Sequence, residues 1–309
     1  MPWKSPDPYV EQVADGVFAY VQPDGSWMIN NAGWVDDGAG TVLVVDTLAT
    51  QARTEKLLGS LEAANAASAA YLVNTHHHPD HTYGNCFLPE STLVVGHERC
   101  RQEMLAAGLE ATRVVTQPTY GNVRVRPPEV TYTDRMTLHL GDRRVELIHP
   151  GPAHTSNDTV VWLPGERVLF SGDVLFVGGQ PFLLEGSLQG FPLALQLIRD
   201  LDPAIVVPGH GPVLRGAEVG AVLDRLGGYA EWVSVIARRG HAAGSSPLAT
   251  AQANQDTEFA TWQESERLAG NLHRAWSELD GNPLDHRLTV PDVWPDMVAL
   301  HGGPIPCHA

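Results

Sequence analysis

Histidine and aspartate side chains gather in one short segment of this sequence. Residues 75–81 read Thr-His-His-His-Pro-Asp-His, so His76, His78, Asp80 and His81 are four potential metal ligands within six residues. The chain has 14 histidines against 20 lysines and arginines, and histidine is the commonest metal ligand in proteins. A chance match to this pattern in a chain of this length is on the order of one in a thousand. The segment therefore predicts a metal site in preference to a surface histidine cluster.

Three further ligand-type residues stand beside glycine or proline. His154 follows Gly-Pro-Ala, Asp173 follows Ser-Gly, and His210 lies within Pro-Gly-His-Gly-Pro. Each stands at the end of a predicted strand, where a rigid scaffold can present a side chain. A single loop histidine is more often structural, but four such positions in one chain indicate a shared centre. Imidazole and carboxylate ligands suit Zn²⁺, and Fe or Mn could occupy the same set.

Short β-rich runs alternate with helical segments and must position these ligands. The ligand-type residues follow three of the predicted strands and precede a fourth. The predicted strands are 17–21, 28–35, 41–45, 70–73, 91–96, 129–133, 137–140, 144–148, 159–163, 167–170 and 204–207, and the helices among them are 51–64, 98–107 and 192–201.

From about residue 216 the pattern becomes helical. Residues 219–239 and 264–279 carry apolar side chains at helical spacing, with a linker at 240–247 and a Pro- and Gly-rich tail at the end. This order favours an α/β fold of two packed sheets flanked by helices. We expect a catalytic core over residues 1–215 and a helical extension over 216–309 that packs on it.

Charge and composition disfavour a broad nucleic-acid-binding surface and exclude a membrane span. The chain carries 36 acidic residues against 20 basic ones, a net charge of −16, whereas phosphate binding needs clustered lysine and arginine. The sequence has no run of about 18 apolar residues and no signal-peptide pattern at its start. We expect a cytoplasmic protein that binds neither nucleic acid nor membrane. Cys86, Cys100 and Cys307 lack CxxC spacing and are expected to be free thiols.

The ordered series of ligand-type residues resembles the metallo-β-lactamase superfamily over roughly residues 10–215. The resemblance implies an αββα sandwich with two metal ions, two Zn²⁺ in our prediction, at one edge between the sheets. The implied ligands are His76, His78 and His154 for the first metal, Asp80, His81 and His210 for the second, and Asp173 as the bridge between them.

Two positions favour the hydrolase branch of this superfamily. The commonest true β-lactamases have cysteine where Asp173 stands, and oxygen-reducing diiron members have glutamate where His78 stands. Two cations about 3.5–4 Å apart lower the pKa of a water between them, so metal-bound hydroxide is the expected nucleophile toward an ester or thioester. Asp80 and Asp173 are the expected catalytic residues. Asp46 is a candidate for orienting a ligand imidazole or, equally, for capping a strand end.

Segments throughout the chain resemble the second-ring cyclase/thioesterases of bacterial aromatic (type II) polyketide biosynthesis, of the actinorhodin type. That resemblance implies aldol closure of the second ring of a poly-β-ketone held on an acyl carrier protein, then thioester hydrolysis. The similar segments are 27–33, 75–85, 151–163, 168–174, 271–275 and 302–309. The candidate substrate-pocket residues are Trp27, Tyr83, Phe176, Phe182 and Phe191.

The residues leave other functions open. The main alternative is another ester, thioester or lactone metallo-hydrolase, such as a lactonase or a glyoxalase II-like enzyme. A phosphodiesterase or nuclease of the same fold is disfavoured by the charge. A non-catalytic metal-binding scaffold is disfavoured because all seven ligand positions are filled. The expected partners are a small-molecule substrate and an acyl carrier protein, with the chain a monomer or homodimer.

Overall fold

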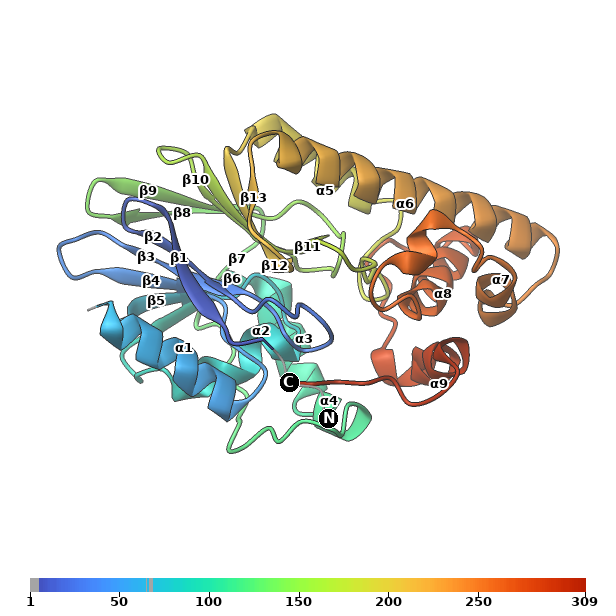
Figure 1. Ribbon diagram of the computed structural model, residues 1–309, viewed down its shortest axis with the longest axis horizontal. Coiled ribbons are helices and arrows are strands. Elements are labelled where there is room, and N and C mark those ends of the chain that lie inside the picture. Colours follow the sequence, from blue (N-terminus) through green and yellow to red (C-terminus); the bar gives the residue numbers. More distant parts are fainter. Residues whose placement is uncertain (1–5, 65, 67–68) are drawn as a thin grey trace.

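Two β-sheets face each other in the centre of the molecule, with helices on their outer sides (Figure 1). The computed structural model describes residues 6–64, 66 and 69–309. Residues 1–5, which belong to the expected core and to the segment inspected for a signal peptide, lie outside this part. The two-sheet architecture confirms the α/β sandwich expected from the order of strands and helices.

The first sheet has the strand order β1-β2-β3-β4-β5-β6-β7. Its first four strands pair antiparallel and the remainder parallel. β4 reads Val-Leu-Val-Val and is buried throughout, as expected of a central strand covered on both faces. The strands are β1 Tyr9–Ala14, β2 Val17–Val21, β3 Ala32–Asp36, β4 Val42–Val45, β5 Ala69–Val73, β6 Leu93–His97 and β7 Val130–Tyr132.

The second sheet has the order β13-β12-β11-β10-β9-β8. β11 and β12 pair parallel, and helix α5 connects them along the chain. The other pairs in this sheet are antiparallel. The strands are β8 Arg135–Leu140, β9 Arg143–Ile148, β10 Val160–Leu163, β11 Val168–Phe176, β12 Ile205–His210 and β13 Leu214–Arg215.

Helices cover both sheets and fill the C-terminal part of the chain. Leu57 and Leu61 of α1 pack with Trp34 and Val44 of the first sheet in one apolar cluster. The helices are α1 Gln51–Ala63, α2 Pro79–Thr82, α3 Glu98–Ala107, α4 Ala111–Val114, α5 Phe191–Leu201, α6 Ala217–Ala242, α7 Pro247–Ala253, α8 Arg267–Leu279 and α9 Val290–His301, with 3-10 turns at Tyr83–Phe87 and Glu258–Thr261.

Several predicted boundaries are corrected by the structure. Residues 28–31 are not strand, because Met28 has a φ of 65° and β3 begins at Ala32. β11 runs to Phe176, well past the predicted end at residue 170, through register shifts on either side of Gly172. Helix α6 continues through Ala242, so the first residues of the predicted linker are helical.

Helix α9 was not predicted, because prolines interrupt its sequence. Pro291 stands in its first turn, where an N–H has no helical partner, and Pro295 lies inside the helix. Beyond α9 the chain returns to the core (Figure 1), where Arg53 Nη2 donates a hydrogen bond to His308 O at 2.8 Å. The C-terminal helices and the core are therefore tied together by the last residues of the chain.

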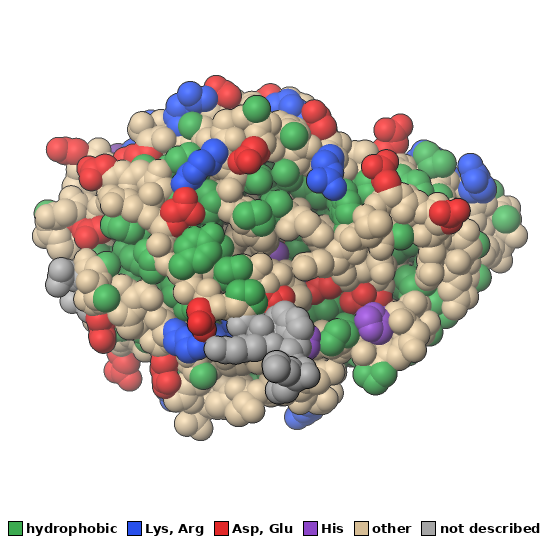
Figure 2. Space-filling model, in the orientation of Figure 1, with side chains coloured by type: hydrophobic (Ala, Val, Ile, Leu, Met, Phe, Trp, Pro, Cys, Tyr) green, Lys and Arg blue, Asp and Glu red, His purple; other side chains and the backbone are tan. Residues whose placement is uncertain are grey.

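The surface agrees with the acidic composition. Acidic side chains are spread over the face shown in Figure 2, among fewer basic ones. Across the described residues, no helix combines the length and the apolar character that a membrane span requires.

Candidate metal centre

Strands from both sheets bring the seven predicted ligands together. His76 and His78 lie in the loop after β5, and the short helix α2 carries Asp80 and His81. From the second sheet, His154 lies in the loop before β10, Asp173 within β11 and His210 at the end of β12. The side chains form two groups, each with its ligand atoms within 4.8 Å of one another. The first ligand group is His76, His78, His154 and Asp173, and the second ligand group is Asp80, His81, Asp173 and His210.

The first ligand group is centred on His154. Its Nε2 lies 2.8 Å from His78 Nδ1 and 3.2 Å from His76 Nε2. The carboxylate of Asp173 completes the group, with Oδ2 at 3.4 Å from His154 Nε2. Three imidazole nitrogens and one carboxylate oxygen thus converge on one point.

The second ligand group lies on the other side of Asp173. Asp173 Oδ1 is 3.0 Å from His81 Nε2, and Asp173 Oδ2 is 3.3 Å from His210 Nε2. Asp80 Oδ2 lies 3.3 Å from the same nitrogen of His210. Asp173 is therefore common to both groups, as a bridging residue would be.

A partner on the outer side of each ring fixes the orientation of the five histidines. In each ring the nitrogen that faces away from the centre has its own hydrogen-bond partner, which is the usual arrangement for metal-ligating imidazoles. The pairs are His76 Nδ1 with Thr75 Oγ1 at 3.1 Å, His78 Nε2 with Glu185 Oε2 at 2.7 Å, His81 Nδ1 with Asp46 Oδ2 at 2.8 Å, His154 Nδ1 with Phe182 O at 2.5 Å, and His210 Nδ1 with Gly25 O at 3.0 Å.

Asp46 contacts both a predicted ligand and the segment that carries the ligands. It follows β4 with a φ of 59°, and its carboxylate accepts hydrogen bonds from the Thr75 N–H at 2.7 Å and the Thr75 hydroxyl at 2.6 Å. The same carboxylate accepts from His81 Nδ1. Because the Thr75 hydroxyl gives its proton to Asp46, it accepts the hydrogen bond from His76 Nδ1.

When the rings of His76, His78 and His154 are neutral, these contacts leave their inner nitrogens without protons. A carbonyl or carboxylate oxygen only accepts, so each outer ring nitrogen donates and the inner nitrogen of a neutral ring has a lone pair. Bare nitrogens of His154 and His78 then face each other at 2.8 Å. Buried His81 Nε2 and Asp173 Oδ1 likewise have no hydrogen-bond partner. A cation among these atoms would resolve both mismatches, so the residues fit the metals that the fold family implies.

Burial and charge set the protonation of the ligands. Burial holds the pKa of His76 and His154 well below its usual range, which favours the neutral ring that metals bind. Burial favours the protonated form of Asp80, but the charges of His81 and His210 outweigh it and lower the pKa of Asp80 to about 2. The carboxylates are therefore ionised and ready to bind a cation.

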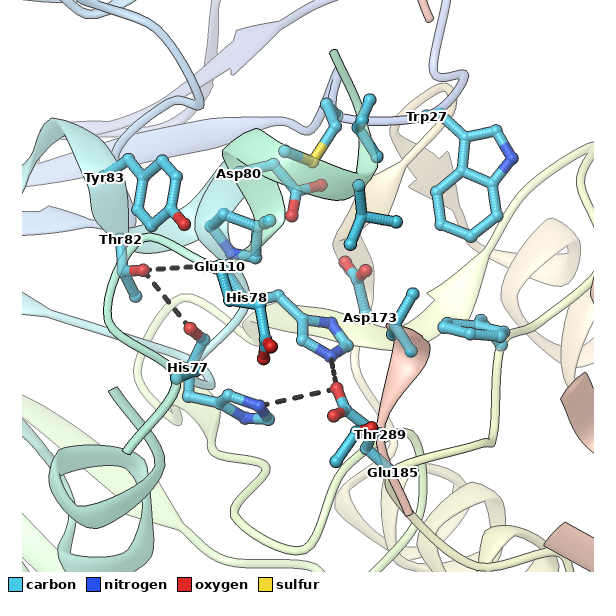
Figure 3. A pocket seen from close by; sticks show the side chains of 18 of the residues that line it. Trp27, His77, His78, Asp80, Thr82, Tyr83, Glu110, Asp173, Glu185 and Thr289 are labelled. Atoms are coloured by element: carbon cyan, nitrogen blue, oxygen red, sulfur yellow. Dashed lines mark hydrogen bonds and ion pairs between the residues drawn. The ribbon is translucent and has the colours of Figure 1, made fainter. Parts of the chain in front are cut away.

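A third group of potential ligands adjoins the first ligand group. Glu185 Oε2 lies 2.7 Å from His78 Nε2 and 3.5 Å from His77 Nε2, and the dashed lines in Figure 3 mark both contacts. His77 also lies against Asn157, whose Nδ2 is 3.0 Å from His77 Nδ1. Glu185 was not identified from the sequence, because it comes from a loop whose position depends on the C-terminal helices.

A largely apolar pocket opens above the two ligand groups. Its cavity volume is about 120 Å³, and it opens to solvent. In Figure 3, Tyr83 and Trp27 stand on opposite sides, with Asp80 and Asp173 between them. Of the predicted pocket residues, Trp27, Tyr83, Phe176 and Phe182 line it. Phe191 does not, since it begins α5 and is fully buried in the core.

The C-terminal helices complete the pocket wall. Trp294 of α9 meets Trp27 edge to face at a centroid distance of 5.8 Å. Buried Arg267 of α8 lies over the rings of Trp27 and Phe176, at 4.4 and 4.5 Å from their centroids. Phe176 in turn stacks on His210 at 4.9 Å. Arg267 and Trp294 were not predicted, since nothing local in the sequence links these helices to the ligands.

Two packed sheets carry histidines and aspartates that gather at their strand ends and form a candidate metal centre. Residues 25–210 match the family model described as the metallo-beta-lactamase superfamily, and the chain belongs to this superfamily. The resemblance inferred from the ligand series is thereby confirmed at the level of the superfamily. The matched residues hold all seven predicted ligands, and they end before α6.

The individual relatives have low sequence identity to this chain, or match only part of it. The chain is 25% identical to the 2,4-dinitroanisole O-demethylase subunit alpha of a Nocardioides species over 202 residues, 64% of this chain and about half (54%) of that protein. It is 23% identical to the type 2 metallo-beta-lactamase of Bacteroides fragilis, covering 67% of this chain and 80% of the relative. With the hydroxyacylglutathione hydrolase of Methylococcus capsulatus it shares 31% identity, over 46% and 48% of the two chains.

Solved structures support the fold. The DIM-1 metallo-beta-lactamase superposes with a TM-score of 0.58 at 24% identity, over 74% of this chain and 99% of DIM-1. The lactamase of Pontibacter korlensis gives the same TM-score at 22% identity, over 71% and 99% of the two chains. At these identities the likeness establishes the fold.

Proposed function

We propose that this chain is a binuclear metal-dependent hydrolase of an ester or thioester, with Zn²⁺ as the metal. The observation that carries the proposal is the pair of ligand groups that share Asp173 on the floor of an apolar pocket. In this proposal His76, His78 and His154 hold one cation, and Asp80, His81 and His210 hold the other. Asp173 contacts both.

In this proposal the cations, Asp80 and the pocket walls have separate roles. When bound, two cations would supply Lewis acidity toward a water molecule and toward the substrate carbonyl. Asp80 lines the pocket, so its ionised carboxylate can orient a water molecule and accept its proton. The apolar walls formed by Trp27, Phe176 and Phe182 hold the acyl part of the substrate and exclude bulk water. A lower local polarity strengthens every charge interaction at the floor.

The narrower proposal is a polyketide second-ring cyclase/thioesterase. The chain segments that resemble that family include residues 27–33, 271–275 and 302–309, which are far apart in sequence. Two contacts support the proposal: Trp27 lines the pocket wall, and Cys307 Sγ donates to Trp27 O at 3.3 Å. Asn271 fixes the loop that carries Phe182. An apolar pocket with aromatic walls suits a poly-β-ketone that becomes flat as its rings close.

The test of this proposal uses a poly-β-ketone bound to its acyl carrier protein. The account expects the metal-loaded protein to release a bicyclic acid, because aldol closure precedes thioester hydrolysis. The Asp173→Ala variant is the negative control. Release of uncyclised chains only, at a rate equal to that of an unrelated carrier-bound acyl group, would refute cyclase activity and leave the hydrolase proposal standing.

A second candidate is hydrolysis of a hydroxyacylglutathione or a lactone. It is favoured by the 31% identity to the hydroxyacylglutathione hydrolase of Methylococcus capsulatus. The pocket walls argue for a more apolar acyl group than this substrate offers. Turnover of hydroxyacylglutathione or of a simple lactone at a higher kcat/KM than that of the carrier-bound poly-β-ketone would decide for this alternative.

A further inference from the structure

Helix α8 presents four buried polar side chains on one face. Arg267, Asn271, Arg274 and Glu278 are spaced four, three and four residues apart, which places them along one side of a helix. Their exposed fractions are between 0 and 8%. Polar groups buried to this degree need hydrogen-bond partners, and the 177–190 loop, between β11 and α5, supplies a partner to each of the four.

The four side chains bind the backbone of this loop along most of its length. Their hydrogen bonds replace the strand or helix pairing that the loop backbone lacks. The bonds are Arg267 Nη1 to Gln180 O at 2.8 Å, Asn271 Nδ2 to Pro181 O at 2.8 Å, Leu183 N to Asn271 Oδ1 at 2.7 Å, Arg274 Nε and Nη2 to Leu184 O at 2.8 and 2.6 Å, and Leu188 N and Gln189 N to the Glu278 carboxylate at 2.9 and 3.1 Å.

The same loop supplies the outer partners of two ligands. Phe182 O accepts from His154 Nδ1 at 2.5 Å, and Glu185 Oε2 accepts from His78 Nε2 at 2.7 Å. Both partners stand between the residues that α8 fixes. The loop also packs directly on the segment before His154, because the Ser187 N–H donates to Ala153 O at 2.9 Å.

The outer partners in the second ligand group do not come from this loop. The outer partner of His81 is Asp46, which follows β4, and that of His210 is Gly25 O. Both belong to the N-terminal part of the chain. A disturbance at Asn271 or Arg274 therefore reaches the outer partners of His78 and His154 but not those of His81 and His210. Arg267 is excluded from this argument, because it lies over Phe176, which stacks on His210.

We infer that the polar face of α8 positions the first metal site through the 177–190 loop, so that the two sites differ in their dependence on the C-terminal helices. This inference rests on the proposed function, because it takes the two ligand groups as cation sites. Asn271 and Arg274 act as positioning residues: they touch neither cation nor substrate, and they hold the backbone that orients two ligand imidazoles. The inference also gives a role to the 271–275 segment, which lies outside the superfamily core.

The test measures the two Zn²⁺ affinities of the full chain by competition with a chromophoric chelator. His154→Ala and His210→Ala assign the binding steps to the first and second ligand groups. Asn271→Leu and Glu185→Leu should weaken the first-group step about 10–100-fold, the usual effect of losing a partner of a ligand, and leave the second unchanged. Glu185→Gln keeps an acceptor for His78 and should recover most of the loss.

The matched control is His273→Gln, on another face of α8, where His273 Nε2 contacts Asp296 Oδ2 at 2.7 Å. This variant should leave both affinities unchanged. If Asn271→Leu fails to fold, Asn271→Asp, which keeps the acceptor for the Leu183 N–H, takes its place. Equal weakening of both steps, or no change in the first, would overturn the inference. A wild-type chain that binds fewer than two Zn²⁺ would instead contradict the proposed function.

Discussion

Asp173 is the one predicted ligand that belongs to both ligand groups. Its carboxylate is 96% buried and lies within 3.4 Å of His81, His154 and His210. Burial favours its protonated form, but the charges of His210 and His81 outweigh that effect and hold its pKa well below the usual range. An ionised carboxylate at this point could bind both cations of the proposed centre.

Replacing Asp173 with alanine should therefore separate the two sites. We expect the rate of hydrolysis to fall by roughly 10²–10³-fold or more, because the loss of one preorganised electrostatic contact has an effect of this size. At least one cation should also bind more weakly. Steady-state kinetics and metal analysis would measure both effects. Asp202→Ala, at an exposed position, is the control. Hydrolysis retained at the wild-type rate in Asp173→Ala would exclude the bridging role.

His97 makes folding stability depend on pH. Its Nδ1 accepts from the Arg99 N–H at 3.2 Å at the start of α3, and its Nε2 contacts Thr133 O at 2.7 Å. Burial first, then the neighbouring ring of His149, lowers the pKa of His97 to about 4. The nearby charges of Arg99 and Asp134 partly offset each other.

Because the folded pKa of His97 is depressed, the unfolded chain binds more protons between pH 6.5 and about 4. Its contribution to stability is complete above pH 6.5 and is lost as the pH falls toward 4. Denaturant unfolding of the metal-free chain over this range should show a smaller loss in His97→Gln, by up to about 3 kcal/mol. His139→Gln, at an exposed position, should follow the wild type. Identical profiles for His97→Gln and the wild type would contradict this assignment.

The sequence predicted the set of ligand-type residues and one candidate partner, Asp46, but not the partners of His78 and His154. Four ligands lie within six residues and the others beside glycine or proline at strand ends, so short patterns reveal them. Glu185 and Phe182 O have no such pattern, because they orient His78 and His154 only after α8 has docked against the 177–190 loop. Phe191 was predicted to line the pocket because it lies near the ligands in the sequence, but it is buried in the core.

At the scale of elements, β11 and β12 approach each other closely at the candidate metal centre. A Cβ atom added to Gly209 would lie 1.9 Å from Asp173 Oδ1 and 2.8 Å from the Gly172 carbonyl carbon. Neither neighbour can move freely, because Asp173 is held among the histidines and Gly172 is backbone. The absence of a side chain at residue 209 is therefore a condition for placing the bridging carboxylate.

Gly209→Ala should displace Asp173 and destabilise the fold by about 1–3 kcal/mol, the usual cost of overpacking, with loss of metal binding. Gly59→Ala is the matched control, since its Cβ would meet nothing within 4 Å on the exposed side of α1. That change should stabilise the chain by about 0.5–1 kcal/mol. Chemical denaturation with metal analysis checks both. A Gly209→Ala variant with wild-type stability and metal content would show that the close approach is not required.

Periodicity predicted most elements of the sandwich, and the failures have physical causes. Helix 98–107 was predicted with the bounds that α3 has. β11 was predicted too short because Gly172, with a φ of 50°, interrupts the apolar run while the strand continues. α9 was missed because Pro295 within it is normally a helix breaker. Tertiary contacts that local sequence does not encode decided both cases.

At the scale of the whole molecule, the C-terminal helices belong to the site although the superfamily match ends at residue 210. Arg267 and Trp294 line the pocket, α8 fixes the 177–190 loop, and the last residues return to the core. The sequence predicted a helical extension but not that its side chains reach the ligands. The net charge of −16 describes the surface, whereas the metal centre depends on five of the 14 histidines.

Metal content measured together with hydrolysis tests the central claim most directly. The full-length protein, purified and dialysed, should bind two equivalents of Zn²⁺ per chain. Removal of the metal by a chelator should abolish thioester hydrolysis, and restoration of Zn²⁺ should recover it. Hydrolysis that persists in the metal-free protein, or a chain that binds no more than one equivalent while fully active, would contradict the binuclear account.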